Sequence, residues 1–208
     1  MITQPEIIEL NPTVIYKNKL SHETTLEQFQ YLDSLSISDV VLSDEMYLLD
    51  KDIFSDLKDE IVKNIRHYEK HICGYTKNPH LEITESWYRQ TIPGNHQDKH
   101  RHPNSMLSGV VYLNVPDYSD EYSGLVIETG HFQFPNFQFE YQCESNRYNT
   151  QSVYIPVKTG EVILFPSWME HYVSTNQSLD ESRKVIAFNT FIRGQITLGG
   201  KYPSVVEI

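Results

Sequence analysis

Histidines are concentrated in one short segment of the chain, GNHQDKHRHPNS, which directly precedes the apolar run SGVVYLNV. His100 and His102 are two residues apart, and residues at this spacing in an extended chain point to the same side. Imidazole nitrogens bind iron, zinc, copper or nickel, and the neighbouring carboxylate of Asp98 offers a further oxygen ligand. The pattern indicates a metal site, and the competing interpretation is a polar loop whose histidines face solvent.

A further histidine, His171, stands near the end of a second segment, GEVILFPSWMEHYV. A single histidine beside a tryptophan is more often a packed, hydrogen-bonded side chain than a ligand. His171 follows the H-x-H pair by roughly seventy residues, however, and a jelly-roll metal site requires such an arrangement. Two ligands then lie at one strand end, and the third arrives on a later strand of the opposite sheet.

Arg183 opens the next apolar run, RKVIAFNTFI, twelve residues after His171. That separation suffices for a loop and the return of a hairpin. An arginine that enters a buried strand beside a metal site can hold a carboxylate through two parallel hydrogen bonds. We interpret Arg183 in this way, and the alternative is an arginine at an exposed strand end.

The N-terminal third must supply the elements that support this site. Apolar residues recur every three or four positions over residues 50–76, which predicts an amphipathic helix. Asp50 or Asp52 can cap its start, and Gly74 stands where a helix usually ends. The segment 24–35 predicts a second, shorter helix.

The pattern changes after residue 80. Short runs rich in Val, Ile, Tyr and Phe are separated by Pro, Gly, Asn and Asp, as in the strands of a sandwich or barrel: SWYRQTI, SGVVYLNV, GLVIET, FQFPNFQFEY, SVYIPV, GEVILF and RKVIAFNTFI. We therefore predict a mostly β fold, a double-stranded β-helix (a cupin-like jelly roll) flanked by N-terminal helices. One domain is expected over 1–208, with N-terminal strands and supporting helices in 1–80, the jelly-roll core in 81–195 and a C-terminal tail in 196–208.

Composition restricts the partners and the compartment. The chain has 208 residues and carries 28 acidic against 17 basic residues, a formal charge of −11, which argues against binding to bulk nucleic acid or to an anionic membrane surface. No apolar run reaches the ~18 residues that a membrane span needs. The start, MITQPEIIEL, lacks signal-peptide features, and the two cysteines form no CxxC pattern, so a cytoplasmic protein is expected.

Two long motifs resemble those of the Fe(II)/2-oxoglutarate-dependent oxygenases. The first is W-Y-R…G-N…H-R-H-P-N-S-x-L-S-G-V-V-Y-L, and the second is G-E-V-I-L-F-P-S-W-x-E-H-Y-V…R-K-V-I-A-F-N. They are most similar to a branch with the signature HxHPxSxxSGVxYL, followed by LFPSWxxHxV and RxxxxFN. The resemblance covers about residues 85–193. It implies a dioxygenase that uses Fe(II), 2-oxoglutarate and O2 and couples oxidative decarboxylation of 2-oxoglutarate to oxidation of a second substrate.

The resemblance also implies roles for individual residues. His100 corresponds to the first iron ligand and His171 to the distal one. Arg183 corresponds to the residue that binds the remote carboxylate of 2-oxoglutarate. Tyr112 stands where related oxygenases often place a hydroxyl against that carboxylate, and Ser108 is a further candidate for the same pocket.

The sequence departs from the wider superfamily at the third ligand. Most members have His-x-Asp or His-x-Glu as the first pair, whereas this chain has His100-Arg101-His102. Either His102 takes the third position or a carboxylate does, with Asp98 as the nearest candidate through the alternative register His96-Gln97-Asp98. Three neutral ligands would leave iron more positive than the usual set.

Two other functions remain open at this stage. The H-x-H pair is compatible with a non-catalytic cupin-like module that binds a ligand or a metal. A zinc hydrolase would need a carboxylate base at the metal, for which Glu170 is the adjacent candidate. The expected substrate of an oxygenase is a small molecule or a protein side chain. The N-terminal third is expected to form a homodimer interface or a lid over the substrate.

Overall fold

The computed structural model describes residues 12–36, 43–75, 80–117, 124–129, 146, 150–197 and 205–207. Both predicted helices are present, as α1 (Leu26–Ser34) and α2 (Ser55–Tyr68). Two 3-10 turns, η1 (Leu48–Asp50) and η2 (Asp52–Phe54), precede α2, and a π-helical turn, η3 (Glu69–Cys73), follows it. The strands are β1 (Tyr16–Lys19), β2 (His80–Thr91), β3 (Gln97–His100), β4 (Leu107–Asn114), β5 (Gly124–Glu128), β6 (Ser152–Pro156), β7 (Glu161–Pro166), β8 (His171–Val173), β9 (Arg183–Arg193), β10 (Gln195–Thr197) and β11 (Val205–Glu207).

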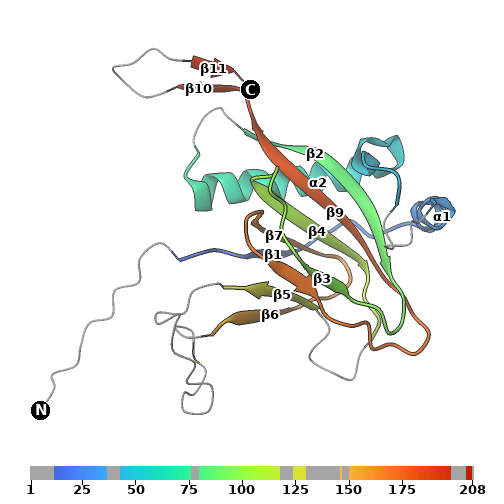
Figure 1. Cartoon of the computed structure of the whole chain (residues 1–208). Helices are drawn as coiled ribbons and strands as arrows, with labels where there is room; N and C mark the ends of the chain where they lie inside the picture. The colour runs from blue at the N-terminus through green and yellow to red at the C-terminus, as the bar shows by residue number, and fades with distance from the viewer. Residues whose placement is uncertain are drawn as a thin grey trace, which may run out of the picture.

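The strands form two facing antiparallel sheets and a separate pair. The major sheet has the order β1-β7-β4-β9-β2, the minor sheet has the order β3-β8-β5-β6, and β10 pairs with β11. Helix α2 runs across one side of the major sheet, and the minor sheet lies on its other side (Figure 1). Six of the seven predicted strand segments coincide with strands of the structure, while the seventh, FQFPNFQFEY, lies outside the described residues.

Alternation along the strands of the major sheet separates two hydrophobic cores. Successive side chains of a strand point to opposite faces. Val111 and Ile186 belong to the core that the helices share with the sheet, whereas their neighbours Tyr112 and Val185 belong to the core between the sheets. The major sheet is therefore covered on both faces, and the face toward the minor sheet is the one that can line an internal site.

The start of the long helix differs from the prediction. Neither Asp50 nor Asp52 caps α2, because the two 3-10 turns precede it and Phe54 occupies the N-cap without a side-chain hydrogen bond. The carboxylate of Asp50 instead lies 2.6 Å from Nζ of Lys58. At the other end the prediction is confirmed: Gly74 caps η3 with a φ of +72°, in the left-handed region that favours glycine.

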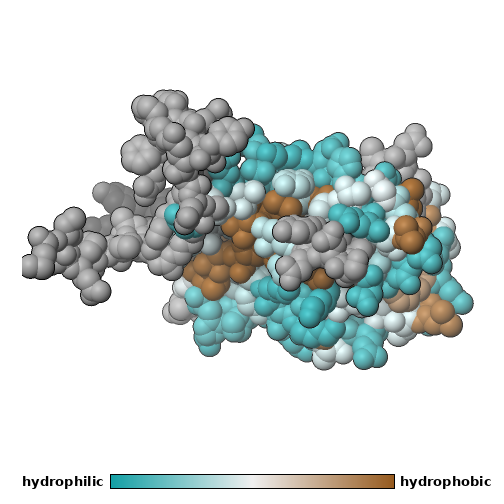
Figure 2. Space-filling view, turned by 90° about the horizontal axis from the view of Figure 1, so that it is seen from below, coloured by the Kyte–Doolittle hydropathy of each residue, from teal (hydrophilic) through white to brown (hydrophobic). Residues whose placement is uncertain are grey.

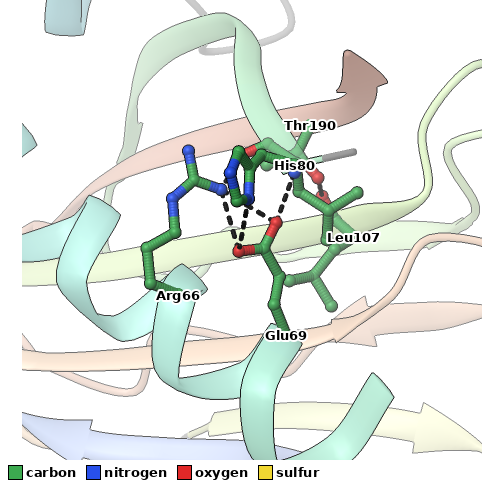
Figure 3. A network of polar contacts seen from close by, with 6 residues as sticks. Arg66, Glu69, His80, Leu107 and Thr190 are labelled. Atoms are coloured by element: carbon green, nitrogen blue, oxygen red, sulfur yellow. Dashed lines mark hydrogen bonds and ion pairs between the residues drawn. The ribbon is translucent and has the colours of Figure 1, made fainter. Parts of the chain in front are cut away.

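A buried carboxylate joins the end of this helical segment to the start of β2. Nη1 of Arg66 lies 2.8 Å from both carboxylate oxygens of Glu69, and the backbone N–H of Leu81 donates to one of them. Nδ1 of His80 lies 3.8 Å from the other oxygen (Figure 3). Glu69 is only 3% exposed, and a buried carboxylate is tolerated when charged and polar donors satisfy it in this way. The contact fixes β2 against the helical layer.

One face of the molecule is mainly polar. Figure 2, which views the molecule from below, shows hydrophilic residues over most of this face and a smaller hydrophobic area near its middle. In the part of the chain that the structure describes, no helix combines the length and the apolar character needed to cross a membrane.

Candidate metal centre and adjoining pocket

Three histidines from different parts of the chain meet between the two sheets. His100 is the last residue of β3 and His171 the first of β8, and the two are direct partners in the antiparallel β3–β8 register. His102 follows two residues after His100. One side-chain nitrogen from each of the three lies within 4.8 Å of the corresponding nitrogens of the other two, which is close enough for all three to bind one ion.

The surroundings keep these imidazoles neutral. Burial lowers the pKa of His102 to about 4 and that of His171 to about 3, and it also lowers the pKa of His100. A neutral imidazole is the form that binds a metal. Nδ1 of His171 lies 3.0 Å from the carbonyl oxygen of Met169, and Nδ1 of His100 lies 2.7 Å from that of Asp98. Because a carbonyl only accepts, each Nδ1 carries the proton and each Nε2 bears a lone pair. In His100 this nitrogen lies 3.0 Å from Nε2 of Gln97, which would have to yield its place to a bound metal.

The carboxylates that the sequence offered as alternatives point elsewhere. The Asp98 side chain is 96% exposed, and its Oδ1 lies 3.1 Å from Nε2 of His96. Glu170 is exposed and does not line the cavity. Among the residues that the structure describes, the metal-ligand cluster therefore consists of histidines alone.

The histidines line a cavity of about 540 Å³, including the space at its open mouth. One wall is the inner face of β2 and β9. Trp87, Arg89 and Thr91 of β2 face the cavity, and their partners in the register are, in the same order, Ala187, Val185 and Arg183 of β9. The remaining wall is mostly apolar and includes Leu125, Phe165 and Val173.

Arg183 and Tyr112 lie close together at one end of this wall. Arg183 is 1% exposed, and its Nη2 donates to the carbonyl oxygen of Ser174, 2.8 Å away, just after β8. Its side chain therefore bridges the two sheets. Tyr112 pairs with Val185 in the β4–β9 register and is also 1% exposed. Burial raises the pKa of the Tyr112 phenol, while the nearby charge of Arg183 opposes this shift. A guanidinium and a protonated hydroxyl are both donors suited to a carboxylate.

Ser108 lines the same cavity from the other end of β4. Its Oγ lies 2.7 Å from Oδ1 of Asn189 and 2.8 Å from Oγ of Ser167, so the hydroxyl is held in a buried polar network. Four residues along a strand separate it from Tyr112, a distance of ~13 Å. The network reaches the metal cluster, because Nδ2 of Asn189 lies 3.3 Å from Nδ1 of His102.

Sequence reasoning assigned no role to Arg89 or Asn189. The signal was available in the alternation of the two strand segments. Every second residue of a strand lies on the same face of the sheet. On β2 this set is Trp87, Arg89 and Thr91, and on β9 it is every second residue from Arg183 to Asn189.

Comparison with known proteins places the chain in a family. Residues 85–189, half of the chain, match the family model described as "Putative 2OG-Fe(II) oxygenase". No curated protein matched the sequence.

Solved structures share the fold at low sequence identity. A Pseudomonas putida prolyl-4-hydroxylase is 12% identical, with a TM-score of 0.56 over 88% of this chain and 94% of that chain. HygX from Streptomyces hygroscopicus, solved with nickel, 2-oxoglutarate and hygromycin B, is 13% identical, with a TM-score of 0.56 over 86% of this chain and 82% of that chain. The carbocyclase SnoK from nogalamycin biosynthesis is 15% identical, with a TM-score of 0.55 over 88% and 81%.

These likenesses confirm the predicted jelly-roll fold. The segment matched by the family model contains all three clustered histidines, and it also contains Tyr112 and Arg183. The protein belongs to the 2OG-Fe(II) oxygenases, the family of enzymes named for 2-oxoglutarate and iron(II).

Proposed function

We propose that this protein is a dioxygenase that couples the oxidative decarboxylation of 2-oxoglutarate to the oxidation of a second organic molecule, and that it acts as one oxygenase domain. The observation that carries the proposal is the convergence of His100, His102 and His171 in a cavity that also contains Arg183. When bound there, iron(II) would supply the redox chemistry that amino-acid side chains lack.

We assign the metal-ligand positions to the three histidines and leave Asp98 out. Their Nε2 lone pairs and neutral state support this assignment for His100 and His171, and proximity supports it for His102. The exposure of the Asp98 side chain and its contact with His96 argue against a carboxylate from that residue.

Arg183 and Tyr112 would hold the remote carboxylate of 2-oxoglutarate. The guanidinium is fixed by its hydrogen bond to Ser174, so little side-chain entropy is lost when it binds a ligand. The Tyr112 hydroxyl would donate to the same carboxylate. Ser108 would contribute from the other end of the cavity by orienting Asn189, which in turn contacts His102.

The apolar wall would exclude water from the reacting groups. Leu125 is fully buried and Phe165 nearly so, and both line the cavity beside the histidines. Removing water strengthens the electrostatic contacts of a bound carboxylate and protects reactive species from side reactions. The size of the cavity favours a small molecule, or one side chain of a larger one, as the substrate.

One observation favours a second candidate function, a non-catalytic cupin-like binding module. The described ligand cluster contains no carboxylate, so it lacks the charge that usually completes the iron site of this superfamily. A zinc hydrolase is not supported, because Glu170 is exposed and lies outside the cavity lining.

Anaerobic titration with 2-oxoglutarate separates the two candidates. The protein is loaded with Fe(II), its iron content is measured, and the weak visible charge-transfer band of a chelated 2-oxo acid is followed. A saturable band, followed by succinate formation when O2 is admitted, supports the dioxygenase. Bound iron without the band would refute the proposed cosubstrate pocket and favour the binding module. A His171→Ala variant, which removes one proposed ligand, is the matched control and should give neither stoichiometric iron nor the band.

A further inference from the structure

We propose that Arg89 forms a second anion-binding position in this cavity and that the molecule oxidised is a small carboxylic acid with an apolar body. The inference rests on the proposed function, because it assigns the remote carboxylate of 2-oxoglutarate to Arg183 and leaves Arg89 for the second molecule. One end of 2-oxoglutarate would be held at the metal, so its remote carboxylate needs only one arginine. The cavity wall carries two.

The strand register places both arginines on the same wall. Thr91 is the direct partner of Arg183, and Arg89, two residues earlier, is the direct partner of Val185. Arg89 and Arg183 are therefore diagonal neighbours on one face of the β2–β9 pair, and both line the cavity. Arg89 lines this cavity together with His100, His102 and His171. An anion on Arg89 would thus lie beside the metal cluster.

The two arginines sit at different depths. Arg183 is 1% exposed and bridges the sheets at the inner end of the wall. Arg89 is only partly buried, and its Nη2 donates to the carbonyl oxygen of His96, 3.3 Å away in the exposed loop before β3. Because 2-oxoglutarate would bind against the metal, the inner position suits its remote carboxylate. The outer position suits a molecule that enters later.

The charge of the cavity favours a further anion. Among the described residues that line it there is no aspartate or glutamate, although the whole chain has a net charge of −11. Burial lowers the pKa of Arg89, and repulsion by Arg183 lowers it further, while Asp98 acts in the opposite sense. A divalent metal and two arginines bring four positive charges, the three histidines bring none, and 2-oxoglutarate brings two negative charges. The described lining supplies no carboxylate against the remaining two charges, so a carboxylate on Arg89 would be electrostatically favourable.

The neighbours of Arg89 define the rest of the ligand. Trp87 precedes it on the same face of β2, Val110 lines the cavity from β4 of the same sheet, and Leu125 lines it from β5 of the facing sheet. The polar atoms that fix orientation are therefore few, and the surrounding wall is apolar. A carboxylate at one end of a hydrocarbon body matches this arrangement, and the carbon nearest the metal cluster would be the one oxidised.

Three four-carbon ligands of similar size and different charge test the proposal. Butyrate, butyramide and butylamine are titrated into the Zn(II)-loaded protein saturated with 2-oxoglutarate, and the Arg side-chain Nε–H signals are followed by NMR. The Arg89 signal is identified by its loss in Arg89→Gln. We expect butyrate to bind at least about tenfold more tightly than butyramide, butylamine not to bind, and Arg89→Gln to reduce butyrate affinity to the level of the amide.

The outcomes separate this inference from the proposed function. In the anaerobic iron titration, Arg89→Gln should bind 2-oxoglutarate within about twofold of wild type, whereas Arg183→Gln should not. The inference is wrong if wild-type protein binds butyrate and butyramide equally, if butyrate binding survives Arg89→Gln, or if butyrate displaces 2-oxoglutarate. The first of these needs no variant, so misfolding of Arg89→Gln cannot hide it. Failure of the wild-type protein to bind 2-oxoglutarate would instead refute the proposed function.

Discussion

Replacing Arg183 by glutamine should remove the ion pair with the remote carboxylate of 2-oxoglutarate. The affinity for 2-oxoglutarate should then fall, while the metal stays bound. Truncating one partner of a buried, hydrogen-bonded charge pair costs about 2–5 kcal/mol, which corresponds to a rise in Kd of about 30-fold to about 4,000-fold. Arg183 is 1% exposed and its Nη2 is already fixed on Ser174, so solvent cannot replace the lost contact. We therefore expect a loss of at least about 100-fold in 2-oxoglutarate affinity.

Pyruvate provides the control for this variant, because it carries the same 2-oxo acid group without the remote carboxylate. Anaerobic titrations of the Fe(II) protein with each acid, followed by the charge-transfer band, give four dissociation constants for wild type and Arg183→Gln. The substitution changes the Kd of each acid by some factor, and the ratio of the factor for 2-oxoglutarate to that for pyruvate isolates the contact between Arg183 and the remote carboxylate. In Arg183→Gln the affinity for pyruvate should change by less than about threefold. Arg183→Lys keeps the charge but loses the planar fork, so its affinity for 2-oxoglutarate should lie between those of wild type and Arg183→Gln.

Two results would refute this reasoning. If Arg183→Gln binds 2-oxoglutarate as wild type does, the carboxylate is held elsewhere, and Arg89 becomes the first residue to test. If affinity for pyruvate falls as far as affinity for 2-oxoglutarate, or if iron is lost, the side chain supports the metal site as a whole.

Other parts of the structure give three more predictions. Metal affinity, measured in competition with a chelator, should stay within about threefold of wild type in Asp98→Asn and fall more than about 100-fold in His102→Ala. A larger loss in Asp98→Asn than in His102→Ala would make Asp98 the third ligand. The metal-free protein should lose stability as pH falls from about 6.5 to about 4, because the unfolded chain binds protons that His102 and His171, with pKa values of about 4 and about 3, do not take up when folded. The difference between the urea unfolding midpoints at pH 7 and pH 5 should then be smaller in His171→Gln than in the wild-type protein. An equal difference in the two proteins would contradict the burial of His171. In Gly109→Ala the new Cβ would lie 2.1 Å from Cζ of Phe188, so thermal unfolding should show a loss of about 1–3 kcal/mol that Phe188→Leu partly restores. An unchanged melting temperature would mean that the ring moves freely.

The fold was predictable because its signals are local. Alternation in segments such as RKVIAFNTFI marks strands, and the motif spacing places strand ends that can meet. The three histidines were expected near one another on the same ground, and the structure brings them within 4.8 Å. The choice between His102 and Asp98 was not predictable, because it depends on which side of β3 the Asp98 side chain occupies and on the path of the chain after β3 ends at His100.

The helical boundaries depended on contacts that the sequence does not display. The π-helical turn begins at the buried Glu69, whose carboxylate accepts from Arg66 on one side of η3 and from the N–H of Leu81 on the other. The predicted cap residue Asp50 is paired with Lys58 instead. Such choices are decided by tertiary partners, whereas helix propensity only limits where the segment can lie.

The pairing of β2 with β9 has a consequence for how the protein is made. His80 lies opposite Arg193 and Thr91 opposite Arg183, so the pairing closes a loop of about one hundred residues. Chain entropy must be lost before such distant contacts form, and topologies of high contact order fold slowly for this reason. Trp87 and Arg89 are synthesised early, yet the wall that they share with β9 is complete only when β9 arrives. Arg183, the proposed partner of the remote carboxylate, lies on β9 itself. We therefore expect the protein to bind 2-oxoglutarate only after the sheet has closed, late in its maturation.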